Sequence, residues 1–140
     1  MTDWPFSHAD EVRFADLDTQ GHLNNVSFLV FVESARMAYA RGVARENPEL
    51  VVSASFTFMV VEVKISYRSP GHFTERIETF LRPSEVGRSS FSLEFEMRAG
   101  ERLLADGYSV LVTYDPGAGR PIAVPQPLRE RLLADGAQQR

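Results

Sequence analysis

The chain of 140 residues is within the size range of one domain, and hydrophobic residues make up 44% of it, which is enough for a sizeable core. Its formal net charge of −4 argues against general nucleic-acid binding, and the absence of cysteine excludes disulfides, a thiolate nucleophile and a cysteine zinc site. The longest unbroken apolar run, Phe28 to Val32, is too short to span a bilayer, so we expect a single soluble, cytoplasmic domain over residues 1–140 with no metal, cofactor or membrane partner.

A short strand is predicted around Glu11 to Ala15, and it leads into the most informative segment, Asp18-Thr-Gln-Gly-His-Leu-Asn-Asn25. This segment places a carboxylate, a flexible glycine, an imidazole and two amides just before a strongly apolar stretch. Gly21 permits a turn that folds Asp18 back over the residues that follow. Asp16 competes with Asp18 for a catalytic role, because both side chains point to the same side if the strand extends that far.

The apolar stretch predicts a helix from about residue 25 to about residue 41, because Asn24 or Asn25 is a suitable N-cap and Gly42 with Pro48 supplies stop signals. Too few polar positions remain for a surface helix, so we expect this helix to be largely buried. Neither asparagine has Glu or Gln three residues later, so no capping box closes the first turn. A substrate oxygen that becomes an oxyanion would be stabilised by the amides left free there.

Other polar residues allow structural as well as functional interpretations. Glu33 is either a rim charge that pairs with Arg36 at i, i+3, which we favour, or a second acid near a substrate. His22 acts as a base or orients a water, or it holds the loop through a backbone hydrogen bond. His8 and His72 lack metal-ligand spacing and are predicted to be surface residues.

Beyond the helix, apolar residues alternate with polar residues, which is typical of half-buried strands. Val61 to Tyr67 predicts the first such strand, which begins near Ser55 and ends at Ser69-Pro-Gly71. A less regular strand is predicted from Phe73 to Leu81, and a turn from Pro83 to Gly87 follows it.

A hairpin is predicted next, because two alternating segments, Phe91 to Met97 and Leu104 to Val112, flank the turn residues Ala99-Gly100-Glu101. Pro127 to Ala134 predicts a terminal helix. One long apolar helix followed by mainly antiparallel strands is an α+β plan, and a strongly apolar helix needs a sheet that curves around it.

The segment Arg13-Phe-Ala-Asp-Leu-Asp-Thr-Gln-Gly-His-Leu-Asn-Asn25, followed by Phe28 and by Glu33-Ser-Ala-Arg36, resembles the hotdog-fold acyl-CoA thioesterases of the 4-hydroxybenzoyl-CoA thioesterase type. The resemblance covers nearly the whole chain. It implies a hotdog fold, with a long central helix wrapped by a curved, mainly antiparallel five-stranded sheet. It also implies homodimers or homotetramers with the pocket between two subunits.

The resemblance gives catalytic roles to residues of the loop. Asp18 corresponds to the family's catalytic carboxylate, acting as nucleophile or general base, and the Asn25 backbone amide corresponds to the oxyanion donor. His22 and Asn24 match a His-x-Asn-Asn variant that also occurs in plant-type acyl-carrier-protein thioesterases. Those enzymes carry Asn where this chain has Gln20, which weakens the carrier-protein reading. Partial desolvation of Asp18 would raise its pKa and suit it to base catalysis.

The resemblance also implies an acyl-CoA substrate and a set of binding residues. Related thioesterases place basic and hydroxyl residues around the CoA phosphates and pantetheine. A solvated polar face explains the same residues equally well. The candidates in this chain, besides Gly21 and Asn24 in the loop, are Lys64, Arg68, Arg88, Ser89 and Ser90.

Three other functions stay open: a thioesterase for acyl carrier protein, another hotdog enzyme such as a hydratase, and a non-enzymatic acyl-CoA-binding protein. The acyl group itself is undetermined, because pocket depth depends on the orientation of aromatic side chains. Those side chains are Phe28, Phe31, Phe56 and Phe58.

Overall fold

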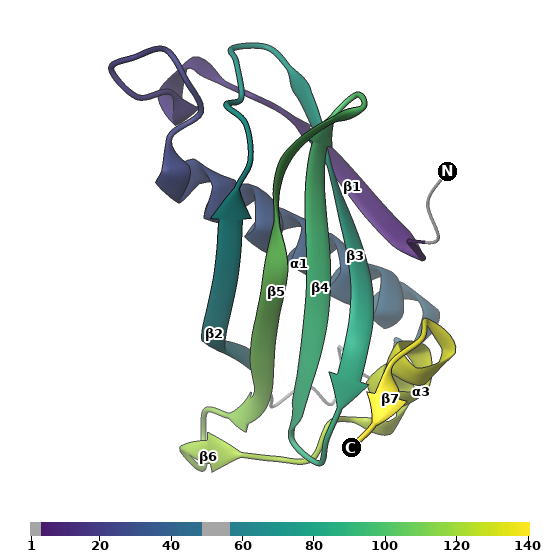
Figure 1. The fold of residues 1–140 in the computed structure, drawn as a ribbon. Coiled ribbons are helices and arrows are strands. Elements are labelled where there is room, and N and C mark those ends of the chain that lie inside the picture. Colours follow the sequence, from purple (N-terminus) through teal and green to yellow (C-terminus); the bar gives the residue numbers. More distant parts are fainter. Residues whose placement is uncertain (1–3, 49–56) are drawn as a thin grey trace.

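The computed structural model describes residues 4–48 and 57–140, and its strands form one sheet against which a long helix packs (Figure 1). A short 3-10 helix, Phe14–Asp16, precedes the long helix. The helices and strands are β1 (Phe6–Glu11), α1 (Asn25–Glu46), β2 (Thr57–Tyr67), β3 (Arg76–Val86), β4 (Ser90–Ala99), β5 (Arg102–Asp115), β6 (Arg120–Pro121), α3 (Gln126–Ala134) and β7 (Gln138–Gln139).

The main path of the sheet has the order β1-β3-β4-β5-β2, with every neighbouring pair antiparallel. Two strands of two residues each extend it: β6 pairs with β5, and β7 pairs with β3 in parallel. The α+β prediction of one long helix on a mainly antiparallel sheet is confirmed. The predicted count of five strands is wrong, because the described residues form a sheet of seven.

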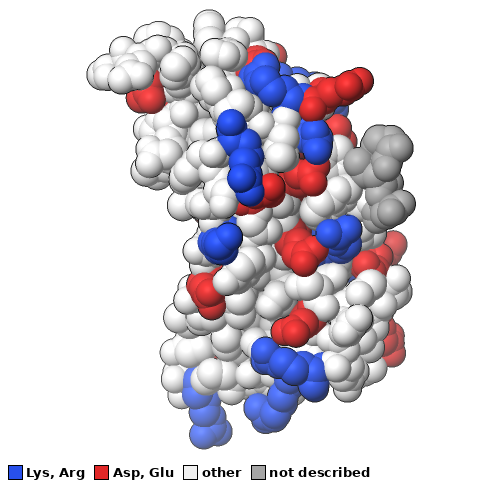
Figure 2. All heavy atoms as spheres, viewed as in Figure 1, with Lys and Arg blue, Asp and Glu red and all other residues white. Residues whose placement is uncertain are grey.

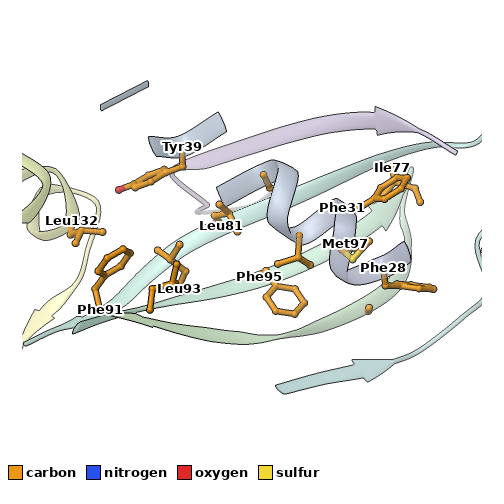
Figure 3. Packing of buried hydrophobic residues seen from close by; sticks show 14 of the residues in the cluster. Phe28, Phe31, Tyr39, Ile77, Leu81, Phe91, Leu93, Phe95, Met97 and Leu132 are labelled. Carbon is orange, nitrogen blue, oxygen red and sulfur yellow. The ribbon is translucent and has the colours of Figure 1, made fainter. Parts of the chain in front are cut away.

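The core lies between α1 and the inner face of the sheet (Figure 3). Strict alternation along β4 turns every second side chain inward, so its apolar residues are buried while their polar neighbours face out. The helix contributes one apolar face, spaced at three and four residues. The buried residues of these two elements are Phe91, Leu93, Phe95 and Met97 in β4 and Phe28, Phe31, Val32, Ala35, Tyr39 and Val43 in α1.

Only one face of α1 is buried in the chain, so the prediction of a largely buried helix is wrong. Val26 is 65% exposed, and Leu29, Val30 and Met37 are also exposed on the opposite face. The edge strand β2 is similarly uncovered, with 55% of Val61 exposed. The sequence supplies more apolar surface than one chain of this fold covers.

Several element boundaries differ from the predictions. The first strand ends at Glu11, where a strand was predicted to start, and the helix runs through Gly42 to Glu46 instead of ending near residue 41. It continues because Val43 packs in the core, which offsets the helix cost of glycine. The predicted start of the next strand at Ser55 lies outside the described residues, and β2 is described from Thr57.

The predicted turn from Pro83 to Gly87 is wrong, because β3 continues to Val86. A register shift between Pro83 and Glu85 marks a bulge in its pairing with β4. On its other side, β3 pairs with β1 only as far as Leu81, so no ladder there requires the missing proline N–H. The hairpin of β4 and β5 and the helix α3 are confirmed.

The outer face of the sheet carries interleaved charges of both signs (Figure 2). Arg82 pairs with Glu94 at 2.8 Å, and its guanidinium also lies 4.3 Å from the ring centre of Trp4. Trp4 in turn contacts Phe80 of β3. None of the helices in the described part of the chain is long and apolar enough to cross a membrane.

Helix α3 is fastened to α1 by a partly buried polar contact. The Tyr39 hydroxyl donates to Asp135 Oδ2 at 2.7 Å, and the Nε of Arg131 donates to the same oxygen at 2.8 Å. Burial and this carboxylate together raise the pKa of Tyr39, with burial the larger cause, so the phenol stays neutral at physiological pH.

We expect Tyr39→Phe to lower the free energy of unfolding by about 1–2 kcal/mol, because the half-satisfied Asp135 carboxylate remains in a partly buried position. Urea unfolding monitored by circular dichroism measures the loss. Tyr108→Phe is the matched control, since its hydroxyl bonds to Glu62 at an exposed site and should change stability by less than about 0.5 kcal/mol. Equal losses in the two variants would contradict a fastening role for Tyr39.

Candidate active site at the start of the long helix

The loop between the 3-10 helix and α1 is folded back on itself by short-range backbone hydrogen bonds. The Asp18 N–H donates to the His22 carbonyl at 2.8 Å, and the Gly21 N–H donates to the Asp18 carbonyl at 3.0 Å. Gly21 has a φ of 79°, in the left-handed region that side chains disfavour. The predicted turn at Gly21 is therefore confirmed.

The Asp18 carboxylate is exposed and accepts two backbone hydrogen bonds at one oxygen. The N–H groups of Gln20 and His22 donate to Oδ1 at 2.9 and 3.1 Å. These bonds, led by that from His22, hold the pKa of Asp18 below its usual value, so the expectation of a pKa raised by desolvation is wrong. The second oxygen, Oδ2, has no hydrogen-bond donor among the described residues.

The start of α1 leaves one backbone amide open. Asn24 is the N-cap, and its Oδ1 accepts from the Val26 N–H at 2.7 Å. Its carbonyl accepts from the N–H groups of Ser27 and Phe28, at 2.9 and 3.3 Å. Within residues 4–48 and 57–140, the Asn25 N–H alone of the first four helical amides has no acceptor. It points out at the positive end of the helix.

Asp16 has a structural environment, in keeping with the preference for Asp18. It is buried, and both of its carboxylate oxygens accept hydrogen bonds from Arg13. The Arg13 side chain lowers the pKa of Asp16, which keeps this buried acid ionised. The Asp16 carbonyl also accepts from the Asn24 N–H at 2.9 Å, which ties the 3-10 helix to the N-cap of α1.

A second loop lies beside the first and brings His72 to His22. The Leu23 N–H donates to the Gly71 carbonyl at 2.8 Å, and the two imidazole rings meet edge to face with their centres 5.5 Å apart. The prediction that His72 is at the surface is confirmed, but sequence reasoning missed its neighbour. His8 instead lies 3.2 Å from Asp10 in β1.

Sequence reasoning also missed Tyr67, the last residue of β2. Its hydroxyl donates to the Asn25 carbonyl at 3.1 Å, and its ring packs edge to face on Phe28, 5.0 Å between centres. The end of β2 thereby meets the first turn of α1. The only signal in the sequence is that Tyr67 closes the alternating pattern of this strand.

The predicted binding residues fall into two groups. Lys64 lies in β2 and Arg68 directly follows it, toward the Tyr67 end of the strand, and Arg68 forms an ion pair with Asp106 at 3.1 Å. The segment Arg88 to Ser90 lies at the other end of the sheet, since Ser90 pairs with Val112 whereas Tyr67 pairs with Ala105. Seven residues of strand separate these ends by about 23 Å.

Within one chain the structure therefore does not bring Arg88, Ser89 and Ser90 to the Asp18 loop. The Ser90 hydroxyl accepts from Arg140 at 2.9 Å, and the Ser89 carbonyl accepts from the Thr113 N–H at 2.8 Å. Arg88 is exposed. The described residues contain no group of three or more His, Asp or Glu side chains arranged to hold a metal ion.

The predicted Glu33–Arg36 ion pair is not formed, since no contact within ion-pair distance joins the two in the described chain. Both residues instead line a cavity that α1, α3 and three strands enclose. Phe58, one of the aromatic residues expected to set pocket depth, also lines it, whereas Phe28 and Phe31 are buried in the core. Phe56 lies outside the described residues.

Comparison with known proteins finds a matching family and a relative of similar sequence. Residues 12–132 match the model of the family described as the thioesterase-like superfamily. Over 87% of this chain and 92% of the other, the sequence is 24% identical to FadM, a long-chain acyl-CoA thioesterase of Escherichia coli (strain K12).

Two solved structures superpose over almost their whole length. A thioesterase from Thermus thermophilus, solved with coenzyme A and Zn, is 33% identical, with a TM-score of 0.79 over 96% of each chain. Slr0204, a 1,4-dihydroxy-2-naphthoyl-CoA thioesterase from Synechocystis, shares the fold at 20% identity, with a TM-score of 0.80 over 91% of this chain and 95% of the other.

Proposed function

Because the chain belongs to the thioesterase-like superfamily, we propose that it hydrolyses an acyl-CoA thioester to a free acid and CoA at the loop that joins Asp18 to the start of α1. Thioester hydrolysis is the activity of the family, and the hotdog fold is confirmed. The carrier, the catalytic residues and the assembly are the parts that we propose.

The open Asn25 N–H is the observation that carries this proposal. An N–H group at a helix N-terminus stabilises negative charge through its own hydrogen bond and through the helix dipole. A thioester carbonyl oxygen gains such charge when a nucleophile adds to its carbon. The Asn24 side chain already accepts from the neighbouring Val26 N–H. The cap therefore leaves the Asn25 N–H as the donor for the thioester oxygen.

Asp18 supplies the other half of the chemistry. Its lowered pKa keeps it ionised, and Oδ2 is free while Oδ1 is held by backbone N–H groups. In one route Oδ2 adds to the thioester carbon, the C–S bond breaks to release the CoA thiolate, and water then hydrolyses the resulting anhydride. In the other, Asp18 takes a proton from a water whose oxygen adds to the carbon instead, and the C–S bond then breaks to release the CoA thiolate and the free acid.

His22 contributes to the site through its backbone, since its N–H donates to Asp18 and its carbonyl accepts from Asp18. This favours the loop-holding role among the readings left open for His22. We assign Gly21 and Asn24 the same kind of role, because the first allows the turn and the second caps the helix. The side chain of His22 remains available to donate a proton to the departing thiolate.

We propose CoA as the carrier, supported by the coenzyme A in the Thermus thermophilus structure and by the activity named for FadM. Lys64 and Arg68 are candidate contacts for its phosphates from the same chain. Arg88, Ser89 and Ser90 lie at the far end of the sheet, so they serve the site only if a second copy supplies them.

A homodimer through β2 supplies that second copy. β2 is an edge strand of 11 residues with exposed apolar side chains, an arrangement that a monomer would leave open to unwanted pairing. Antiparallel pairing of two β2 strands would continue the sheet and carry the partner's far end toward the Asp18 loop. Two such dimers form the tetramer that is the larger alternative.

We expect Val61→Lys to convert the dimer to monomers and to lower turnover, because the lysine lies on the uncovered edge of the sheet. Light scattering after gel filtration measures the mass. Leu133→Lys, which changes an exposed apolar residue on α3, is the control and should leave mass and turnover intact. A native protein that is already monomeric would refute the shared site.

The function itself is tested by release of free thiol from short, medium, long and aryl acyl-CoA esters. We expect turnover of at least one class by the native protein. Turnover only with acyl carrier protein esters would identify that protein, and not CoA, as the carrier. Hydration of a crotonyl thioester would identify a hydratase. Tight acyl-CoA binding without any reaction would identify a binding protein and refute hydrolysis.

A further inference from the structure

A cavity beside the middle of α1 is not used by the chemistry described above. It lies between α1, α3 and the inner faces of β2, β4 and β5. Tyr39 of α1 and Phe91 and Leu93 of β4 lie around it (Figure 3). Its wall is apolar apart from two charged side chains of α1, Glu33 and Arg36.

Arg36 is half-buried there without a matching acceptor. No hydrogen bond or ion pair to its guanidinium is present in the described chain. Glu33 is the charged group with the largest electrostatic effect on it. Burial lowers the pKa of Arg36, but an arginine side chain keeps its charge in proteins. A desolvated guanidinium without an acceptor is costly, so this environment suits a ligand that brings an oxygen atom.

An apolar stripe connects this cavity to the proposed reaction centre. The exposed residues Val26, Leu29, Val30 and Met37 recur at three- and four-residue spacing with Glu33, so they share one face of α1. The stripe begins one residue after Asn25 and ends at the cavity, which Met37 also lines. From Asn25 to Glu33 and to Arg36, the helix rises about 12 and 16 Å.

From this arrangement we infer that the substrate's acyl chain lies along the stripe and that Arg36, with Glu33, binds a hydroxyl group near its far end. The inference rests on the proposed thioesterase function and narrows its substrate to a medium-length hydroxyacyl thioester. An extended chain advances about 1.2 Å per bond, so the hydroxyl lies roughly ten to fourteen bonds from the thioester carbon.

The two charged residues select a hydroxyl over other end groups. A hydroxyl both accepts and donates, so it satisfies Arg36 as donor and Glu33 as acceptor. A carboxylate satisfies Arg36 but is repelled by Glu33. A plain methyl end leaves the guanidinium without an acceptor, and a site of that kind discriminates strongly against the group that lacks the oxygen.

Paired substrates test the inference directly. The probes are decanoyl-CoA with ω-hydroxydecanoyl-CoA, and dodecanoyl-CoA with ω-hydroxydodecanoyl-CoA, assayed by thiol release. We expect kcat/KM of the native protein to favour the hydroxyl member by about tenfold or more, and Arg36→Met to remove that preference by lowering the hydroxyl rate alone. Arg41→Met, on an exposed part of α1 outside the cavity, is the control and should keep the preference.

The inference is overturned if the native protein shows no preference, or if Arg36→Met slows both members equally. It is also overturned if Arg36→Met dissociates the dimer, since Arg36 would then serve the partner subunit. Calorimetric binding of ω-hydroxydecanoic and decanoic acids separates this result from failure of the proposed function. A preference for the hydroxy acid that Arg36→Met removes supports the cavity even if no thioester is hydrolysed.

Discussion

Replacing Asp18 by asparagine is expected to lower kcat for thioester hydrolysis by about a thousandfold or more. The amide is nearly the same size and keeps an oxygen for the N–H groups of Gln20 and His22, so the loop should hold its shape. The variant lacks the ionised Oδ2 that either route requires. Single-turnover and steady-state thiol release, with circular dichroism to show an intact fold, measure the effect.

The adjacent acid provides the control. Asp16→Asn removes a buried carboxylate that Arg13 binds through both oxygens, so it should lower stability more than kcat. Turnover near that of the native protein in Asp18→Asn would exclude Asp18 from the chemistry. Loss of kcat only in Asp16→Asn would move the catalytic role to the buried acid.

The pH dependence has a definite sign. Asp18 acts as the carboxylate, and backbone hydrogen bonds hold its pKa below the usual value of an aspartate, so activity that depends on it is lost only in strongly acidic solution. Loss of kcat/KM between pH 5 and 6 would therefore have to come from another group. Rates measured at short times, before acid unfolding, make this comparison.

The second large effect is on stability, at Gly107 in the middle of the sheet. A Cβ atom built there would overlap the Lys64 carbonyl oxygen and would lie 3.0 Å from the Ile65 Cα. These are backbone atoms of β2, which cannot rotate away as a side chain can. Gly107 also faces Phe95 of β4 across the other ladder, so β5 has little room to move.

Gly107→Ala is therefore expected to cost several kcal/mol, roughly 3 or more, or to detach β2 from the sheet. Urea unfolding measures the loss, and hydrogen exchange of the β2 amides shows whether that strand alone opens. If this edge strand forms the dimer, the variant should also lose its partner. A variant as stable as the native protein would mean that β2 and β5 separate more easily than their pairing indicates.

Gly42→Ala is the matched substitution of the opposite sign. Gly42 lies inside α1 with open space around its Cβ position, so alanine should add about 0.5–1 kcal/mol through helix propensity. This corresponds to a rise of about 3 °C in Tm for a domain of this size. A fall in Tm would indicate that Gly42 is in contact with something outside the single chain, such as a second copy.

The elements predicted well from sequence are those with a strong local pattern. The hairpin of β4 and β5 has a clear period of two, and α1 has a long apolar stretch with an asparagine N-cap. β1 lacks a clean alternation, since its burial pattern is mixed, and its place was mistaken. Gly42 and Pro83 were predicted to end regular structure. The helix continues because Val43 packs in the core, and β3 continues because no residue of β1 pairs with Pro83.

The same distinction holds for the candidate site. Asp18, Gly21, Asn24 and Asn25 lie within one short segment, so the turn at Gly21 and the cap at Asn24 follow from spacing and turn chemistry. His72 and Tyr67 reach this segment from loops and strands more than forty residues away in sequence. Single-sequence patterns carry no information on such contacts, and the exposed apolar surface that predicts a partner becomes visible only when the fold is known.

The stacking of Arg82 on Trp4 has a spectroscopic consequence. The chain has one tryptophan, so intrinsic emission reports on the β1–β3 side of the sheet, where Trp4 contacts Arg82 and Phe80. Fluorescence would thus follow the release of this outer strand, while far-ultraviolet dichroism follows the sheet as a whole. If the two denaturation midpoints coincide, the sheet unfolds as one cooperative unit. If emission changes first, β1 separates from the sheet before the rest unfolds.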